Sequence, residues 1–291
     1  MYLYGVKSMD QQTNPLQKYY RQPKIYLTLP SKGKYYPQGS LDFLPTGEHP
    51  VYPMTAKDEL SFKTPDALLN GQATVDVIQS CIPSIKNAWD LPTLDLDAVL
   101  IAIRIATFGE QMDMNINVPN TDIEKGFSVD LRILLGQFGN IDFEDTVQLG
   151  QFTVKLKPLT YKDFTDQAMK SFEEQRVFAL VNDQSIEEEQ KLAVFRQSFK
   201  KLTELNIGTV VKSIQSIEVD GEIVTDRNMI EDFVANCEQS FFKGILDHLD
   251  SQKKKFQIQP MQVQADEEEI AQGAPETFDV PIVFDQAHFF A

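Results

Sequence analysis

The sequence predicts an α+β protein with a helical core, short antiparallel hairpins, an extended N-terminal arm rich in Pro, Gly and Tyr, and a small C-terminal strand module. Three observations support this class. Apolar residues recur at helical spacing in several long stretches, short alternating runs flank turn-forming residues, and the N-terminal stretch carries no regular apolar period. We therefore expect an arm at 1–50, a helical region at 51–145 with a β-hairpin at 112–131, a second α+β region at 146–255, and a tail module at 256–291.

The composition is that of a folded globular protein. Of the 291 residues, 42% are hydrophobic and 24% are charged, which is close to the average of globular domains. The net charge of −16 repels phosphate backbones, so we expect no direct binding to nucleic acid. The apolar runs are too short for a membrane span, so we expect no membrane partner. The N-terminus lacks the basic and apolar regions of a secretory signal.

The first predicted elements follow the arm. Lys24 to Leu29 alternates enough to predict one short strand, and the surrounding Pro and Gly exclude a long element. A helix is predicted to begin where Thr64 can act as the cap and Pro65 fits the first helical position. Gly71 divides this helix from a second one that continues to Ile82.

The central helix and a hairpin come next. Residues 95–108 are apolar nearly all round and are followed by Gly109, which predicts a central buried helix. Residues 112–118 and 127–131 alternate on either side of a polar loop and predict the β-hairpin. A third strand is expected within residues 150–160.

Two long helices are predicted in the second region. Thr160 and Asp163 form a capping pair before a helix over 161–181. Ser185 and Glu188 predict the start of the next helix. Its apolar stripe is expected in the core, as for most aromatic residues on helices, and consists of Leu192, Phe195, Phe199 and Leu202.

The remaining elements are a hairpin, a helix and the tail. Residues 209–226 predict two strands joined by a tight turn at Asp220-Gly221. Asp226 is expected to cap one continuous helix over 227–252, and the three lysines that follow suit its C-terminal end. In the tail, Phe278 to Phe284 alternates and predicts a returning strand, and the acidic stretch 265–273 before it is expected to be a loop.

No combination of Cys and His residues predicts a metal site or a cofactor. Cys81 and Cys237 lie in helical apolar patterns and are expected to be buried free thiols of a protein in a reducing compartment. His49, His248 and His288 have no second His or Cys at the spacing of metal ligands, and we expect them at the surface or half-buried.

Catalysis is not indicated either, and we expect no enzyme. A carboxylate-based hydrolase is kept as an alternative because the chain has 43 Asp and Glu residues. The residues to test for it are Asp95, Asp97 and Asp163. Asp95 and Asp97 would point to different sides of a helix, which does not suit a matched acid and base.

Aromatic residues outside the predicted helices gather near both ends of the chain. Buried aromatic side chains commonly anchor protein contacts. We therefore predict that these residues clamp against the body of the protein or bind a partner, and that the last three form a hook at the C-terminus. They are Tyr19, Tyr20, Tyr35, Tyr36, Phe284, His288, Phe289 and Phe290.

Five segments, in this order along almost the whole chain, resemble a known family. The chain is similar to tail proteins of T-even-type contractile bacteriophages, the group of baseplate hub and hub-assembly subunits. The segments that carry the resemblance are Leu29 to Pro37 (LPSKGKYYP), Tyr52 to Leu60 (YPMTAKDEL), Ile103 to Glu110 (IRIATFGE), Pro158 to Phe164 (PLTYKDF) and Phe284 to Phe290 (FDQAHFF).

This resemblance implies a structural protein of the baseplate or tail hub. Its partners would be other hub subunits or further copies of itself in a symmetric assembly. It would be found in host cytoplasm during assembly and then in the virion. The alternative is a transient chaperone of hub assembly that is absent from the mature virion. Related chains often carry Cys-Pro-x-Cys knuckles, but residues 118–121 read Val-Pro-Asn-Thr, so zinc is not expected here.

Overall fold

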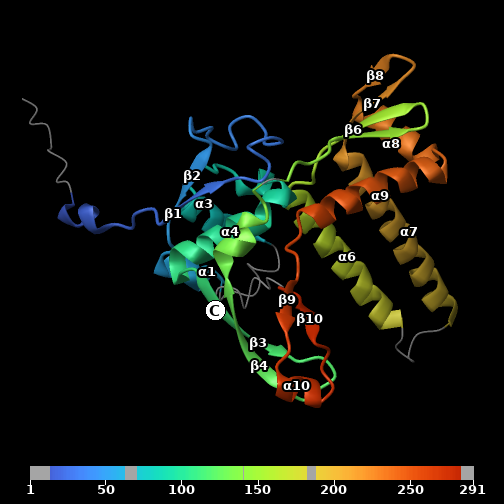
Figure 1. Ribbon diagram of the computed structural model, residues 1–291. Helices are drawn as coiled ribbons and strands as arrows, with labels where there is room; N and C mark the ends of the chain where they lie inside the picture. Colours follow the sequence, from blue (N-terminus) through green and yellow to red (C-terminus); the bar gives the residue numbers. More distant parts are fainter. Residues whose placement is uncertain (1–13, 63–70, 140, 182–187, 283–291) are drawn as a thin grey trace, which may run out of the picture.

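The computed structural model describes residues 14–62, 71–139, 141–181 and 188–282 (Figure 1). It mixes helices with short antiparallel sheets, which confirms the α+β class. The described residues form two hydrophobic cores, one centred on helix α4 and one on a four-stranded sheet. The predicted helix start at Thr64 and Pro65 lies outside the described residues. No helix in the described ranges has the length and apolar character needed to cross a membrane.

Helix α4 (Thr93–Phe108) is the centre of the first core. Ten of its residues are buried, which confirms the central helix predicted from its apolar sequence. It ends at Gly109, whose φ of 95° lies in the region that favours glycine. Short helices surround it: α1 (Ala56–Phe62), α3 (Gln72–Cys81), η2 (Ala88–Asp90) and α5 (Leu131–Gly136).

Residues from the N-terminal stretch also build this core. β1 (Ile25–Thr28) confirms the predicted strand and pairs antiparallel with β2 (Glu48–Val51). The side chains of Leu27, Leu29 and Val51 are buried against α4 and its neighbours. Burial of these side chains fixes the β1–β2 pair to the body.

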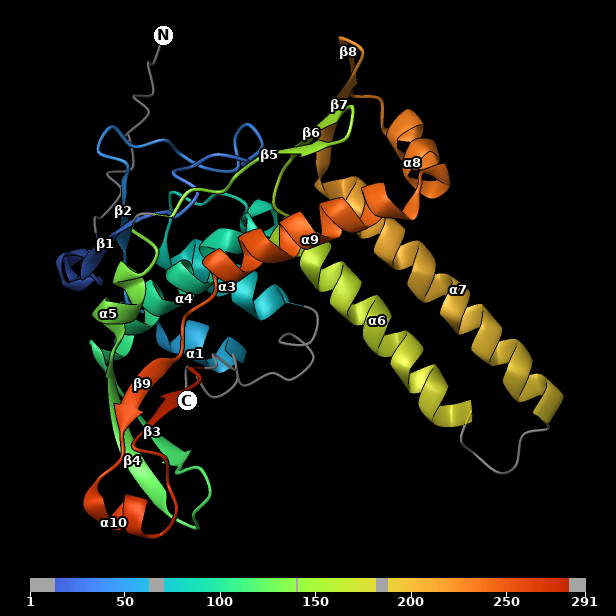
Figure 2. The ribbon, with the colours of Figure 1, turned by 45° about the vertical axis from the view of Figure 1, so that its right-hand side comes forward.

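The predicted hairpin is confirmed and extends below the first core (Figures 1 and 2). β3 (Gln111–Asn117) and β4 (Glu124–Asp130) pair in a continuous antiparallel register. Beside them, β9 (Met261–Gln264) pairs with β10 (Thr277–Val280). The described part of the predicted strand alternates as expected, with Phe278, Val280 and Ile282 buried.

The acidic stretch before β10 is a helix and not the expected loop. α10 (Glu267–Ala271) begins at Asp266, whose side chain accepts a hydrogen bond from the backbone of Glu269, while the Glu269 side chain accepts one from the backbone of Asp266. This reciprocal capping satisfies two backbone donors at the helix start. Lys125 on β4 forms an ion pair with Glu269 at 2.8 Å, so α10 is tied to the hairpin.

The second core lies under the sheet with strand order β5-β6-β7-β8. Asp220 and Gly221 join β7 to β8 with φ values of 52° and 81°, which confirms the predicted tight turn. β5 was not predicted, because its sequence lies in an acidic Gly-containing stretch that resembles a loop. The strands are β5 (Thr146–Leu149), β6 (Phe152–Leu156), β7 (Ile214–Val219) and β8 (Glu222–Val224).

The last predicted helix is two helices, α8 (Arg227–Asn236) and α9 (Gln239–Lys255). Asp226 caps α8 as expected, and α9 ends at the three lysines. The chain turns at Cys237, which has extended dihedral angles. Because of this turn, the ring of Phe241 packs edge-on against Phe233 at 5.0 Å, a contact that one straight helix would not allow.

Helices α6 (Tyr161–Val181) and α7 (Glu188–Ser213) lie side by side, and their far ends extend away from the body (Figure 2). Ion pairs of Lys212 with Asp163 (2.7 Å) and of Lys201 with Glu174 (3.0 Å) show that the two helices are antiparallel. Thr160 donates to and accepts from Asp163, which confirms the capping pair. The predicted start of α7 at Ser185 lies outside the described residues.

Two expectations for α7 are wrong. Residues 209–213 continue the helix, and the strand begins only at Ile214, because Val210 and Val211 fall on the buried side of α7. The predicted core stripe is largely in solvent. Leu192, Phe195 and Phe199 are 50%, 45% and 62% exposed.

Candidate partner-binding surface

An exposed apolar segment precedes the first strand. We call Asn14 to Tyr20, which includes the single-turn helix η1 (Pro15–Tyr19), the N-terminal aromatic segment. The Asn14 side chain accepts a hydrogen bond from the Leu16 backbone at 3.0 Å, which supports the first turn. Leu16, Tyr19 and Tyr20 are 61%, 74% and 57% exposed. Three large apolar side chains in one short segment are a candidate contact site.

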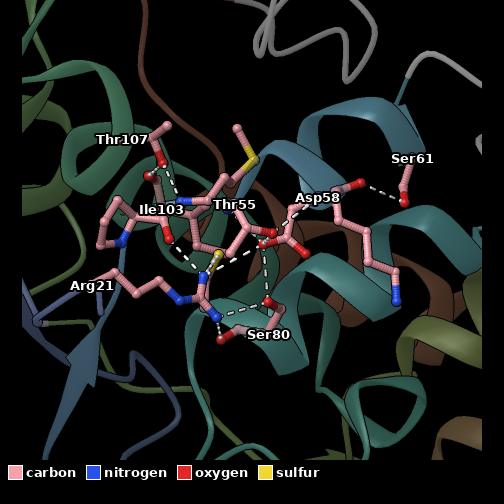
Figure 3. Close-up of polar contacts among 11 residues, drawn as sticks. Arg21, Thr55, Asp58, Ser61, Ser80, Ile103 and Thr107 are labelled. Atoms are coloured by element: carbon pink, nitrogen blue, oxygen red, sulfur yellow. Dashed lines mark hydrogen bonds and ion pairs between the residues drawn. The ribbon is translucent and has the colours of Figure 1, made fainter. Parts of the chain in front are cut away.

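Arg21 fixes this segment to the body (Figure 3). Its guanidinium group donates to the Pro53 carbonyl at 2.6 Å and to the Ser80 carbonyl and hydroxyl at 2.7 and 2.9 Å. It also lies 3.4 Å from the Asp58 carboxylate and 5.8 Å from the ring centre of Tyr52. A guanidinium group with several acceptors and one anion forms a strong, directional contact. Arg21 therefore fixes the point from which the N-terminal aromatic segment projects.

The acceptor for Arg21 is itself held by the start of α1. Asp58 Oδ2 accepts hydrogen bonds from the Thr55 backbone (2.7 Å), the Thr55 hydroxyl (2.8 Å) and the Ser80 hydroxyl (3.0 Å). The Thr55 hydroxyl in turn accepts from the Asp58 backbone at 3.2 Å. This reciprocal cap places a buried carboxylate beside Arg21. Cys81 lies next to it, and burial together with the charge of Asp58 raises the pKa of this thiol to about 12.

The second pair of predicted aromatic residues lies in a loop clamped to α4. Asp95, which is fully buried, accepts hydrogen bonds from the Ser31 backbone (2.7 Å), the Ser31 hydroxyl (2.6 Å) and the Tyr36 hydroxyl (3.0 Å). Burial raises the pKa of Asp95 to about 6, although these hydrogen bonds oppose the shift. Burial and the charge of Asp95 raise the pKa of Tyr36. Tyr35 packs edge-on against Phe143 at 5.6 Å.

The structure therefore separates the predicted partner-binding residues. Tyr19 and Tyr20 are adjacent and exposed, whereas Tyr36 has its hydroxyl inside the protein and Tyr35 packs on a neighbouring segment. The remaining candidates lie outside the described residues: Phe284, His288, Phe289 and Phe290. A role in partner binding stays a prediction for the whole set.

Two residues of the enzyme alternative, Asp95 and Asp163, have separate partners. Asp95 is engaged by Ser31 and Tyr36, and Asp163 by Thr160 and Lys212. Burial raises the pKa of Asp97. Among the residues that the structure describes, no three His, Cys, Asp or Glu side chains are grouped so that they could hold a metal ion.

Two histidines and the cysteines can be placed. His49 is buried on β2, so the expectation of a surface or half-buried side chain is wrong for it. Its Nδ1 lies 2.8 Å from the Ser84 hydroxyl, and burial lowers its pKa. His248 Nε2 lies 2.7 Å from the Glu144 carbonyl. Cys81 and Cys237 are free thiols, buried and half-buried respectively.

Arg21, Asp58 and Ser80 were not among the residues predicted from the sequence. The Thr-x-x-Asp spacing of Thr55 and Asp58 is a signature of a helix start and would have predicted α1. A lone Arg in a Pro- and Tyr-rich stretch gives no comparable signal, because its partners are distant in the sequence.

The segments behind the family resemblance meet around α4. Ser31 of the first segment binds Asp95, Met54 of the second donates its backbone N–H to the Thr107 hydroxyl of the third at 3.0 Å, and Tyr161 of the fourth donates its N–H to the Leu91 carbonyl at 2.7 Å. These segments are therefore anchors of the first core. The fifth lies outside the described residues.

Comparison with known proteins gives one result. A family model described as T4 bacteriophage base plate protein matches residues 22–264, which is most of the chain. No curated protein and no solved structure matches the chain. The matched region contains the four segments that meet around α4, whereas Tyr19, Tyr20 and the C-terminal aromatic residues fall outside it.

Proposed function

Because this chain belongs to the T4 bacteriophage base plate protein family, we propose that it is a structural component of the hub of a contractile-tail baseplate and acts through protein–protein contacts, without catalysis. Membership of the family implies contacts with other baseplate proteins and a place in the virion tail. The assignment to the hub rests on the resemblance of its sequence segments to hub and hub-assembly subunits. The same resemblance supports assembly in host cytoplasm before incorporation.

The observation that carries the contact role is the N-terminal aromatic segment. Tyr19 and Tyr20 are exposed while the next residue, Arg21, is fixed by a fork of hydrogen bonds to the body. A rigid anchor directly after exposed aromatic side chains lowers the entropy lost when a partner covers them. Aromatic residues are also common energetic centres of interfaces.

The first experiment is mass spectrometry of purified virions. A structural component predicts peptides of this chain at a ratio comparable to other baseplate proteins. Their absence would refute the proposal and would favour a transient chaperone of hub assembly.

The second experiment tests the contact residues. Phage carrying Tyr19→Ala and Tyr20→Ala together should assemble fewer complete tails, and the fraction of complete tails is counted by electron microscopy. Tyr26→Ala is the matched control, because Tyr26 is 62% exposed but lies on β1 outside the N-terminal aromatic segment. Equal tail counts for the double variant and the control would contradict the proposed role of Tyr19 and Tyr20 in partner contacts.

A further inference from the structure

The two faces of the α6–α7 helix pair differ in chemistry. One face forms an open groove of about 390 Å³ whose lining is rich in charged side chains, among them Asp163, Lys170, Glu174, Lys201 and Lys212. Ion pairs between the helices cross this side. These two ion pairs join α6 to α7 on the charged side of the helix pair.

The opposite face is apolar on both helices. An α-helix advances by about 100° per residue, so Phe164, Ala168 and Phe172 form one row on α6, turned away from the groove. On α7, the spacing of Leu192, Phe195, Phe199 and Leu202 gives a similar row. Because the helices are antiparallel, both rows lie on the same side of the pair. We call these seven residues the apolar face.

Much of the apolar face is exposed to solvent in the part of the chain that the structure describes. Phe164, Phe172 and Phe199 are 45%, 56% and 62% exposed, and Leu192 and Phe195 are comparably exposed. Phe195 and Phe199 stack on one another with ring centres 6.5 Å apart. Contiguous exposed apolar surface of this kind marks a binding site in soluble proteins.

We propose that the apolar face pairs with the same face of a second copy of this chain, so that two α6–α7 pairs form a four-helix bundle. An antiparallel helix pair with one apolar side has the shape of half a four-helix bundle. A two-fold axis brings identical surfaces together and leaves none of them open. This pairing is independent of the proposed place in the hub.

The exposed area is sufficient for such a dimer. A phenylalanine buries roughly 150–250 Å² when fully covered, so five large side chains that are about half exposed offer on the order of 500 Å² per copy. Two copies would bury about 1,000 Å², the lower bound of a specific interface. A single helix from another protein would lie along only part of this two-row surface.

The net charge of the α6–α7 pair is also compatible with the binding of a second copy. Residues 161–213 contain eight Lys or Arg and nine Asp or Glu, a net charge of −1, whereas the whole chain carries −16. Two nearly neutral helix pairs can meet with little repulsion between like charges. The net charge of the α6–α7 pair therefore does not oppose self-association, although the whole chain is strongly acidic.

The test is sedimentation velocity of the purified full-length chain over a series of protein concentrations. The wild type should form a dimer as concentration rises. The variant F172E/F199E should raise the dimer dissociation constant by on the order of 100-fold, because it places charges at the centre of the interface. The matched control is I223E/M229E, because Ile223 and Met229 are each 65% exposed but lie on β8 and α8.

The folded state of each variant is checked by circular dichroism, which should be unchanged because all four side chains are exposed. A wild type that stays monomeric at every concentration would overturn the proposal, including the case in which another baseplate protein binds the apolar face. A dimer that survives F172E/F199E, or one that I223E/M229E dissociates equally, would also overturn it.

Discussion

Replacement of Arg21 by Ala should destabilise the first core and release the N-terminal aromatic segment. The side chain makes three hydrogen bonds of 2.6 to 2.9 Å to Pro53 and Ser80 and lies 3.4 Å from Asp58. Hydrogen bonds of charged groups contribute about 1.5–3 kcal/mol each, but the Arg21 side chain is 27% exposed, so water replaces part of them. We expect a loss of about 2–3 kcal/mol in total.

The assay is urea unfolding followed by tryptophan fluorescence. Trp89 is the one tryptophan in the sequence, and it stacks on Tyr161 with ring centres 5.7 Å apart at the first core. Chymotrypsin digestion of the native protein is the second readout. Cleavage after Tyr20 should be faster in the variant, because the segment no longer has its anchor.

Arg132→Ala is the matched control. Arg132 also pairs with carboxylates, Asp130 at 2.8 Å and Glu110 at 3.0 Å, but its side chain is 60% exposed. Exposed pairs contribute about 0–1 kcal/mol. If Arg21→Ala unfolds at the same urea concentration as Arg132→Ala, the reasoning that Arg21 is an anchor is refuted. Arg21→Lys keeps the charge but not the forked geometry, so its stability should be intermediate.

Three further predictions concern single sites. The pKa of Asp95 is raised to about 6, so its contribution to stability is full below about pH 4 and is lost as the pH rises towards 6. The difference in unfolding free energy between wild type and Asp95→Asn should therefore change by about 2–3 kcal/mol across this range, and a constant difference would contradict the burial argument. In the native protein, iodoacetamide should modify Cys237 well before Cys81, because Cys81 is buried whereas Cys237 is half-buried. Burial raises the pKa of both thiols, that of Cys81 to about 12. Mass spectrometry identifies the modified site, and equal rates would show that Cys81 is accessible. Gly221→Ala should cost about 1 kcal/mol in urea unfolding because φ is 81° there, and unchanged stability would mean that the turn adapts.

The sequence was sufficient where a local pattern determines the structure. The apolar run before Gly109 predicted α4, and the Asp220-Gly221 pair predicted the β7–β8 turn, because both signals depend on neighbouring residues. The α8–α9 break at Cys237 was not predictable, since it depends on how Phe241 meets Phe233 and Phe152 in the second core.

The candidate site was predicted only in part for the same reason. Tyr19 and Tyr20 could be singled out as aromatic residues outside helices, but their anchor could not. Arg21 is 32 residues from Pro53 and 59 residues from Ser80 in the sequence, and only the packing of α1 and α3 brings these acceptors together. Tyr36 was also singled out as an aromatic residue outside helices, but its hydroxyl binds the buried Asp95 of the same chain. This contact could not be predicted from the sequence, because Asp95 lies 59 residues away.

Helices α7 and α9 show what an apolar stripe determines and what it leaves open. On α9, Phe241 and Ile245 are buried, because β5 lies so close that a Cβ atom on Gly244 would be 2.5 Å from Leu149 Cδ2. On α7, a stripe of the same period is exposed, because α6 packs against another side of the helix. The helical period decides which residues share a face, and the neighbouring elements decide whether that face is covered. The wrong prediction of burial for the α7 stripe and the proposed dimer therefore rest on one observation. The α7 sequence has the pattern of a buried helix, and the described residues of a single copy leave this stripe largely exposed.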